Sequence, residues 1–280
     1  MIKEYKALKY KGKVVFHKMI VTSPKRDLKP FQNNEACFMF VKQGSFSVRT
    51  PDQFVPFKEN EGLLAKCFNF FIETNKEQRE QESIMDFVGV FLFPSHVENL
   101  LNLDLSESNK SINYNIKNLN VTLLFKSFRE SVEVLIDNPH LADEQIIETK
   151  IKEFVLLASK SQNMLPVDFL ASMFKVNETK FELIIQNNLF SNLTVKQFGQ
   201  LCAMSISSFK RKFKEVYLIS PKKYIANKKL EKAQDLLTNS SKRIADIAFI
   251  CGYDTISTFN RAFKAKTKVS PTQFRLTQNA

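Results

Sequence analysis

The sequence predicts an α+β protein, with a β-rich N-terminal domain that also carries helices at residues 1–165 and an all-α C-terminal domain at residues 166–280. Three observations predict this fold. Short apolar runs without helical period fill the first hundred residues, apolar residues at helical spacing follow, and the last hundred residues contain an internal repeat of paired helices. A chain of 280 residues is long enough for two domains of ordinary size.

The first hundred residues are expected to form strands. Val14–Val21 and Ala36–Val41 are apolar runs of strand length, and the turn Lys42–Ser45 leads from the second run into Phe46–Thr50. We interpret these last two runs as a β-hairpin. Further strand candidates are Phe54–Phe57, Leu63–Phe68, Phe70–Glu73 and Val88–Phe93. Their spacing favours an antiparallel sheet or barrel.

Two longer segments, Leu119–Ile136 and Leu141–Ser159, have apolar stripes typical of amphipathic helices. In the first helix the stripe includes Leu124 and Phe128. The stripes either pack against the sheet or form a contact between two copies of the chain. Shorter helices are predicted at Pro166–Phe174 and Thr179–Gln186.

No catalytic, cofactor or metal site is expected. The three histidines lie far apart in sequence and form no HxH pair, and the phosphate-binding and nucleophile motifs of common enzymes are absent. Four widely spaced cysteines form no CxxC pair, which favours buried thiols in a reducing cytoplasm over a zinc ribbon or a methyl-transferring repair centre. The chain has no apolar run of membrane-spanning length and no secretion signal at its start.

The positive charge is concentrated at one end of the chain. Residues 181–280 hold 17 of the Lys and Arg residues and 6 of the Asp and Glu residues, whereas the preceding residues hold the other 24 and 23. The C-terminal part therefore carries nearly all of the formal charge of +12. This asymmetry indicates a polyanionic partner for that part, although basic surfaces also serve membranes or solubility.

The C-terminal repeat is visible when the chain is compared with itself. Ser208–Lys214 matches Thr258–Lys264 at an offset of 50, and the match continues from Ser220 to Ser270. Upstream the offset is 49, with Cys202 against Cys251. One residue inserted in the turn of the second copy explains this change.

Each copy has the pattern of a helix-turn-helix, at about residues 194–216 and 243–266. Thr194 and Ser205 are good N-caps for the two helices of the first copy. Paired phenylalanines, four residues apart, mark the buried face of the second helix in each copy. Between the copies, Ser220 and Pro221 begin a linker helix that runs to about Leu237.

The outward face of the second helix in each copy carries residues that are suited to reading DNA. Arg and Lys donate to guanine, Asn pairs with adenine, Ser and Thr are adaptable, and Ile meets a thymine methyl, whereas Lys also neutralises phosphates. A solvated face on an ordinary helix is the alternative, but two such copies in the basic segment favour DNA. The candidate DNA-binding residues are Ser207, Ser208, Lys210, Arg211, Lys214, Ile256, Ser257, Thr258, Asn260, Arg261 and Lys264.

These motifs resemble the AraC/XylS family of bacterial transcription regulators. The resemblance runs from Leu193 to Arg275 and is strongest over residues 244–264 and in Lys268–Pro271 with Phe274 and Arg275. It implies base contacts through Ser207, Lys210 and Arg211 in the first copy. In the second copy it implies base contacts through Ile256, Ser257, Thr258, Asn260 and Arg261.

The resemblance also implies the organisation of the whole chain. Family members often have a cupin-like N-terminal domain with dimerisation helices, regulated by a small effector or by a protein partner, and most are activators that contact RNA polymerase. We therefore expect a cytoplasmic, nucleoid-associated homodimer that binds double-stranded DNA with sequence specificity and does not bind a membrane. The alternative is an architectural protein that binds DNA without marked sequence preference.

Six phenylalanines of the N-terminal part either line an effector pocket or form its core. They are Phe38, Phe40, Phe46, Phe68, Phe70 and Phe71.

Overall fold

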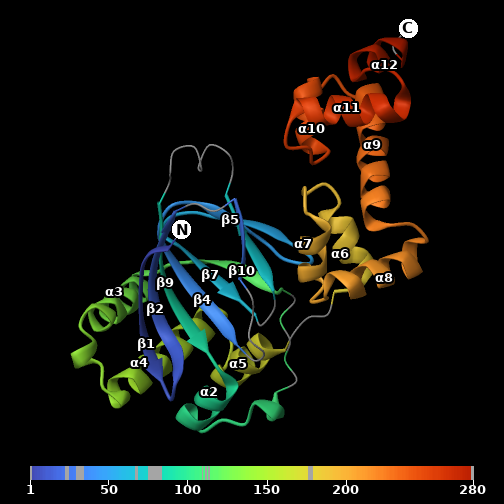
Figure 1. Cartoon of the computed structure of the whole chain (residues 1–280). Coiled ribbons are helices and arrows are strands. Elements are labelled where there is room, and N and C mark those ends of the chain that lie inside the picture. Colours follow the sequence, from blue (N-terminus) through green and yellow to red (C-terminus); the bar gives the residue numbers. More distant parts are fainter. Residues whose placement is uncertain are drawn as a thin grey trace. The chain divides into compact units, whose positions relative to one another are not determined.

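A computed structural model describes residues 2–22, 25–29, 35–66, 69–74, 84–108, 110, 112, 114–175 and 179–278. The chain divides into two compact units, Met1–Glu178 and Thr179–Ala280, shown in Figure 1. Helix α5 (Pro166–Phe174), which the sequence analysis assigned to the C-terminal domain, belongs to the first unit. Its residues Phe169, Leu170 and Met173 are fully buried in the N-terminal core, and this packing moves the division to a point after α5.

Two antiparallel sheets form the centre of the N-terminal unit. The first has the strand order β1-β2-β9-β4-β7-β10, and the second has the order β3-β8-β5-β6. The strands of the first sheet are β1 (Ile2–Tyr10), β2 (Lys13–Thr22), β9 (Ile84–Leu92), β4 (Ala36–Gln43), β7 (Glu61–Ala65) and β10 (Ile116–Asn120). Those of the second are β3 (Arg26–Lys29), β8 (Phe70–Glu73), β5 (Phe46–Arg49) and β6 (Phe54–Phe57).

The hairpin predicted between residues 36–41 and 46–50 is wrong. Strand β4 pairs with β9 and β7 in the first sheet, whereas β5 pairs with β6 and β8 in the second. Both faces of β4 are apolar and buried, so the strand occupies an inner position with a partner along each edge. The turn at Gly44, which has φ +92°, carries the chain from one sheet to the other.

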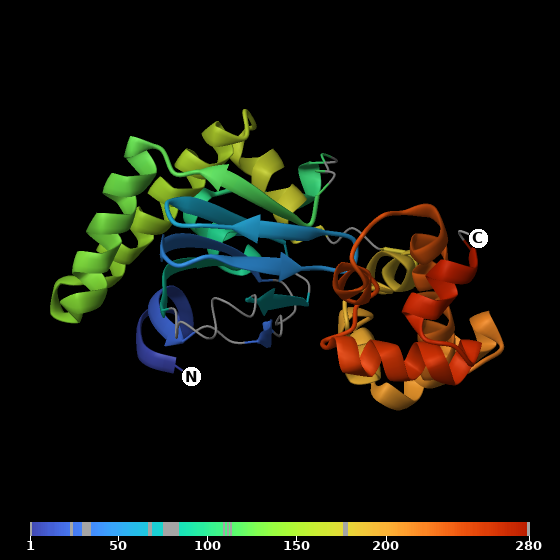
Figure 2. The same cartoon turned by 90° about the horizontal axis from the view of Figure 1, so that it is seen from above.

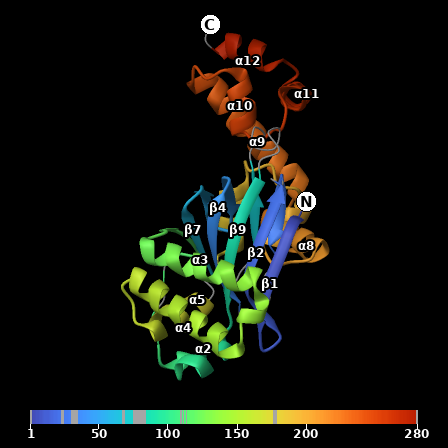
Figure 3. The same ribbon diagram turned by 90° about the vertical axis from the view of Figure 1, so that its left-hand side faces the viewer.

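The first sheet is the middle layer of the unit. Alternate residues of β4 face opposite layers: Phe38 and Phe40 pack under the helices, while Cys37, Met39 and Val41 pack against the second sheet. Helices α3 and α4 run along one face of the first sheet, as Figures 2 and 3 show. The Phe38 ring stacks on Phe125 of α3 at a centroid distance of 5.6 Å.

The helices of this unit are α2 (Pro94–Leu101), α3 (Leu123–Asp137), α4 (Glu144–Ser161) and α5, with short 3-10 turns η1 (Leu105–Glu107) and η2 (Pro139–Leu141). Helix α3 begins four residues later than predicted, because Leu119 is in β10 and pairs with Gly62 of β7. Leu124 was predicted to face inward but is 62% exposed. The side chain of Asp143 caps α4 by accepting from the backbone N–H of Ile146.

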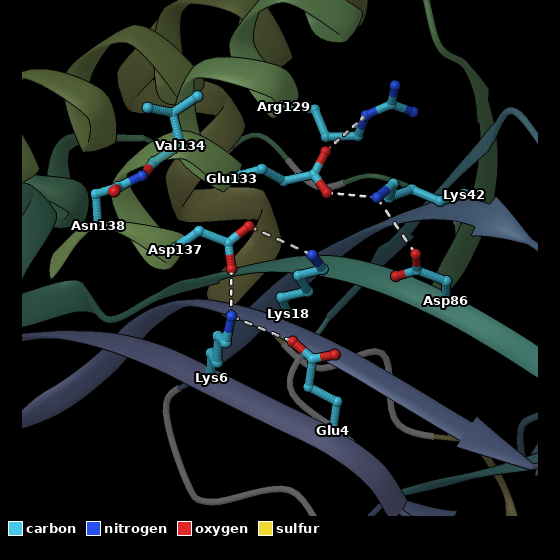
Figure 4. Close-up of polar contacts among 10 residues, drawn as sticks. All are labelled: Glu4, Lys6, Lys18, Lys42, Asp86, Arg129, Glu133, Val134, Asp137 and Asn138. Atoms are coloured by element: carbon cyan, nitrogen blue, oxygen red, sulfur yellow. Dashed lines mark hydrogen bonds and ion pairs between the residues drawn. The ribbon is translucent and has the colours of Figure 1, made fainter.

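Ion pairs fix α3 to the sheet, as shown in Figure 4. Lys42 of β4 donates to Glu133 of α3 and lies 3.3 Å from Asp86 of β9. One turn further along α3, Asp137 accepts from Lys6 of β1 at 2.6 Å and from Lys18 of β2 at 3.4 Å. The helix is therefore attached to three strands, β1, β2 and β4, by side chains with opposite charges.

The second unit is all helical. Its helices are α6 (Phe181–Asn188), α7 (Val195–Leu201), α8 (Ile206–Tyr217), α9 (Pro221–Asn239), α10 (Ile244–Ile250), α11 (Ile256–Thr267) and α12 (Pro271–Gln278). Helix pairs α7–α8 and α10–α11 lie at opposite ends of α9 (Figures 1 and 3). The predicted α+β class, with a β-rich N-terminal part and a helical C-terminal part, is confirmed.

Candidate nucleic-acid interface

The first helix pair is built by local capping and by a phenylalanine core. The Thr194 hydroxyl accepts from the N–H of Gln197, and the Gln197 side chain accepts in return from the N–H of Thr194, which makes a capping box for α7. Phe209 and Phe213 of α8 are fully buried. The Phe209 ring stacks on Phe198 of α7 at 6.2 Å. The buried ring row fixes which face of α8 remains outside.

The second pair repeats this construction. Phe259 and Phe263 of α11 are fully buried, and Phe259 lies edge-on to Tyr253 at 5.3 Å. The turn between α10 and α11 contains Gly252 with φ +77°, and its counterpart in the first pair, Ala203, has φ +52°. Both turns therefore use one left-handed residue.

The sequence-predicted site residues lie on the outward faces of α8 and α11. Ten of the eleven are exposed and Ser208 is half-buried. The exposed residues are Ser207, Lys210, Arg211 and Lys214 on α8 and Ile256, Ser257, Thr258, Asn260, Arg261 and Lys264 on α11. Each helix thus presents a row of polar and basic side chains opposite its phenylalanine row.

Two of these residues have a local structural role. The Ser208 N–H donates to the Ser205 hydroxyl, which in turn lies 3.0 Å from the Ser208 hydroxyl. In the second pair, Thr255 and Thr258 make the same contacts, with hydroxyls 2.9 Å apart. The hydroxyls of Ser208 and Thr258 are therefore engaged in N-capping, a role that the cap pattern of the repeat could have indicated.

The basic side chains of the two helices are open to a polyanion. Arg211 and Arg261 are exposed, and across residues 179–278 neither guanidinium has a carboxylate within ion-pair distance. Lys212 instead lies over the Phe181 ring, with Nζ 5.0 Å from its centroid. Arginine with free donors can make the paired hydrogen bonds that guanine or phosphate accepts.

The cysteines and acidic groups of the described residues do not form a metal centre. Cys202 and Cys251 are free thiols, Cys37 is buried, and Cys67 lies outside the described residues. Burial raises the pKa of the Cys202 thiol to about 12 and that of Cys251 to about 11, which keeps both protonated. No group of three metal-ligating side chains, and no helix long and apolar enough to cross a membrane, occurs in the described ranges.

The six phenylalanines considered as pocket residues are mostly core. Phe38, Phe40, Phe70 and Phe71 are fully buried, and Phe68 lies outside the described residues. Phe46 is 2% exposed and contributes to the lining of a cavity of about 670 Å³ together with Phe54 and Phe57.

Comparison with protein families gives two matches. A helix-turn-helix domain matches residues 199–277, and the ExsA N-terminal regulatory domain matches residues 36–167. The chain belongs to the AraC family of transcription regulators. In this AraC-family chain, the first match covers α8–α11 and most of α12, and the second covers β4–β10 with α2–α4.

Curated relatives of this AraC-family chain are regulators. The chain is 29% identical over 136 residues to the virulence regulon transcriptional activator VirF of Yersinia enterocolitica, a match that covers 48% of this chain and 50% of VirF. It is 26% identical over 127 residues to the regulator ExsA of Pseudomonas aeruginosa, covering 45% and 46%. The chain thus spans about half the length of the curated relatives it matches.

Among solved structures, the fatty-acid-bound ToxT of Vibrio cholerae is similar over 93% of this chain and 95% of that chain, with 13% identity and a TM-score of 0.38. The C-terminal domain of AraT from Geobacillus stearothermophilus is 32% identical over 35% of this chain and 80% of that chain, with a TM-score of 0.32.

Proposed function

We propose that this chain is a sequence-specific regulator of transcription that binds double-stranded DNA through α8 and α11. The observation that carries the proposal is the repeated exposed row on these helices, in which Arg211 and Arg261 occupy equivalent places above equivalent buried phenylalanines. A second helix packed on a buried face, with basic and amide groups outward, is the arrangement that enters a major groove.

The length of α9 supports binding to successive grooves. With 19 residues it is about 28 Å long at 1.5 Å per residue. Successive major-groove segments on one side of B-DNA are about 34 Å apart. Helix pairs at the two ends of α9 therefore have a separation of the right order to contact neighbouring turns of one duplex.

The side chains divide into two roles in this proposal. Lys210, Arg211, Asn260 and Arg261, with the smaller Ser207, Ile256 and Ser257, are suited to base edges. Lys214 and Lys264, one turn further along each helix, are suited to phosphates and set register without reading sequence. Ser208 and Thr258 contribute mainly by ordering the helix starts.

The N-terminal unit is proposed to regulate this binding and to hold two copies together. Cavities of about 670 Å³ and about 500 Å³ support a small effector as the signal, and a regulatory protein partner is the alternative. The exposed leucines Leu123 and Leu124 at the start of α3 support self-association through that helix. By analogy with the transcriptional activator VirF, we propose activation through RNA polymerase in the cytoplasm, at the nucleoid.

Selection of bound fragments from a random duplex library, followed by gel-shift titration, tests the proposed function. A recovered motif with two conserved segments about one helical turn apart is expected. The specific site should bind roughly 10³-fold or more tightly than unrelated DNA at physiological salt. Equal binding to all sequences, with one common salt slope, would instead identify an architectural protein.

A further inference from the structure

The turn between α6 and α7, which leads into the first helix pair, contacts the second pair directly, apart from the connection through α9. The carbonyl of Phe190, in the turn before α7, lies against Gly252 in the turn between α10 and α11. A Cβ built on Gly252 would be 2.4 Å from the Phe190 carbonyl oxygen, closer than real Cβ atoms come. Glycine is therefore required here by the approach of the α6–α7 turn as well as by its positive φ.

A buried lysine from the linker helix completes this contact. Lys229 of α9 is 8% exposed, and its Nζ donates to the carbonyl oxygen of Gly252 at 2.6 Å. The same ammonium lies 5.4 Å from the centre of the Tyr253 ring. Burial lowers the pKa of Lys229, and the charge of Asp254 acts in the opposite direction.

A second lysine of α9 reaches the other side of the junction. Lys232 Nζ lies 3.8 Å from the centroid of the Phe190 ring, a close cation–π contact. One turn of α9 thus contacts the α6–α7 turn through Lys232 and the second pair through Lys229. The equivalent turn of the first pair carries Ala203 rather than glycine, so the close approach is a property of the second turn only.

We propose that Lys229 is a positioning residue that, with Phe190 and Gly252, fixes the orientation of the second helix pair relative to the first. The second pair packs on α9 through Leu230, Ala233 and Leu237, and the first pair packs on Tyr224 near the start of the same helix. Bending or twisting of α9 between these two contacts would rotate one pair against the other. The junction adds a second point of attachment and removes that rotation. The proposal rests on the proposed function, since it states how the two reading helices are kept in phase with one duplex.

Spacing within the DNA site gives a direct test. Each base pair inserted between the two halves of the recovered motif shifts the second groove by about 3.4 Å and rotates it by about 35°. The full chain is titrated against the native site and against the site with one inserted base pair, in gel shifts at fixed salt. The ratio of the two dissociation constants is the spacing penalty, and it does not depend on the fraction of folded protein.

Lys229→Met and Gly252→Ala are compared with the unaltered chain, and Lys228→Met serves as the matched control. Lys228 is the adjacent residue of α9, and it pairs with Glu231 at 2.7 Å away from the junction. The unaltered chain and the control should show a spacing penalty of roughly 10-fold or more, as for a mismatched contact. Lys229→Met should bind the native site more weakly and reduce the penalty to within about threefold, because a second pair that is held by α9 alone can adjust its orientation to the insertion.

The alternative results are separable. Variants that lose affinity but keep the full spacing penalty would overturn the proposal, since Lys229 and Gly252 would then serve folding alone. An unaltered chain that binds its motif without a spacing penalty would also overturn it and would leave sequence-specific binding standing. Failure to recover any motif would refute the proposed function, and this proposal with it.

Discussion

Replacing Glu133 by Gln should destabilise the N-terminal unit more than replacing Asp137 by Asn. Both residues lie on α3, both accept from sheet lysines, and both changes remove a charge while keeping the shape. They differ in burial, because the Glu133 side chain is 14% exposed and the Asp137 side chain is 36% exposed. The pair is thus a matched test of how burial sets the strength of an ion pair (Figure 4).

The expected magnitude follows from the surroundings. Exposed ion pairs contribute about 0–1 kcal/mol, whereas breaking a fully buried pair costs about 3–5 kcal/mol. Lys42 keeps Asp86 at 3.3 Å after the change, but Arg129, 3.6 Å from Glu133, loses a carboxylate. We therefore expect Glu133→Gln to cost about 1–3 kcal/mol and Asp137→Asn to cost less than about 1 kcal/mol.

Urea unfolding of the full chain, followed by circular dichroism at neutral pH, measures both free energies of unfolding. One molar salt should abolish the cost of Asp137→Asn and leave most of the cost of Glu133→Gln, because buried charges are screened less. Equal costs at low salt, or a Glu133→Gln chain as stable as the unaltered one, would refute the reasoning.

Four further outcomes are expected. Arg211→Ala and Arg261→Ala should each weaken specific binding by about 1–3 kcal/mol, or roughly 5- to 150-fold, in gel-shift titrations, and unchanged affinity in both would contradict the assigned reading helices. The fragment 179–280, which is a compact unit, should bind the same motif as the full chain, and a folded but inert fragment would argue against the modular division. The full chain should sediment as a dimer at micromolar concentration, and a purely monomeric sedimentation profile would contradict the proposed self-association. The hydrogen bond from Lys6 lowers the pKa of Asp137, so its stabilisation is fully present above the ordinary carboxyl pKa and is lost as the pH falls through the lower native pKa. In acid titrations the difference between the unaltered chain and Asp137→Asn should begin to shrink below about pH 4 and disappear only at still lower pH.

Local signals made the C-terminal helices predictable. Thr194, Ser205 and Ser220 cap helices because their hydroxyls accept from N–H groups only three residues away, and paired phenylalanines four residues apart mark a buried face. The repeat then transferred the same assignment to residues 244–267. The outward positions of Arg211 and Arg261 followed from this periodicity alone.

Long-range pairing was less predictable. The turn at Gly44 suggested a hairpin, but the partners of β4 come from β9 and β7, far along the chain. Leu119 fits the helical spacing of the apolar residues in α3. It lies in a strand all the same, because β10 pairs with β7 at the edge of the first sheet. The contact between Lys229 and Gly252 could not be predicted either, because it joins residues 23 positions apart and nothing in a lysine-rich helix marks one lysine as buried.

Neighbouring residues of β4 pack on opposite faces of the first sheet. Met39 lines the cavity of about 500 Å³ between the sheets, and Phe40, the next residue, lies 6.2 Å from the Phe128 ring of α3. A pleated strand cannot move one of these side chains without moving the other. A molecule that filled the cavity and displaced Met39 would therefore also shift Phe40, against which α3 packs. The helix would move with it, and so would the exposed Leu123 and Leu124 at its start.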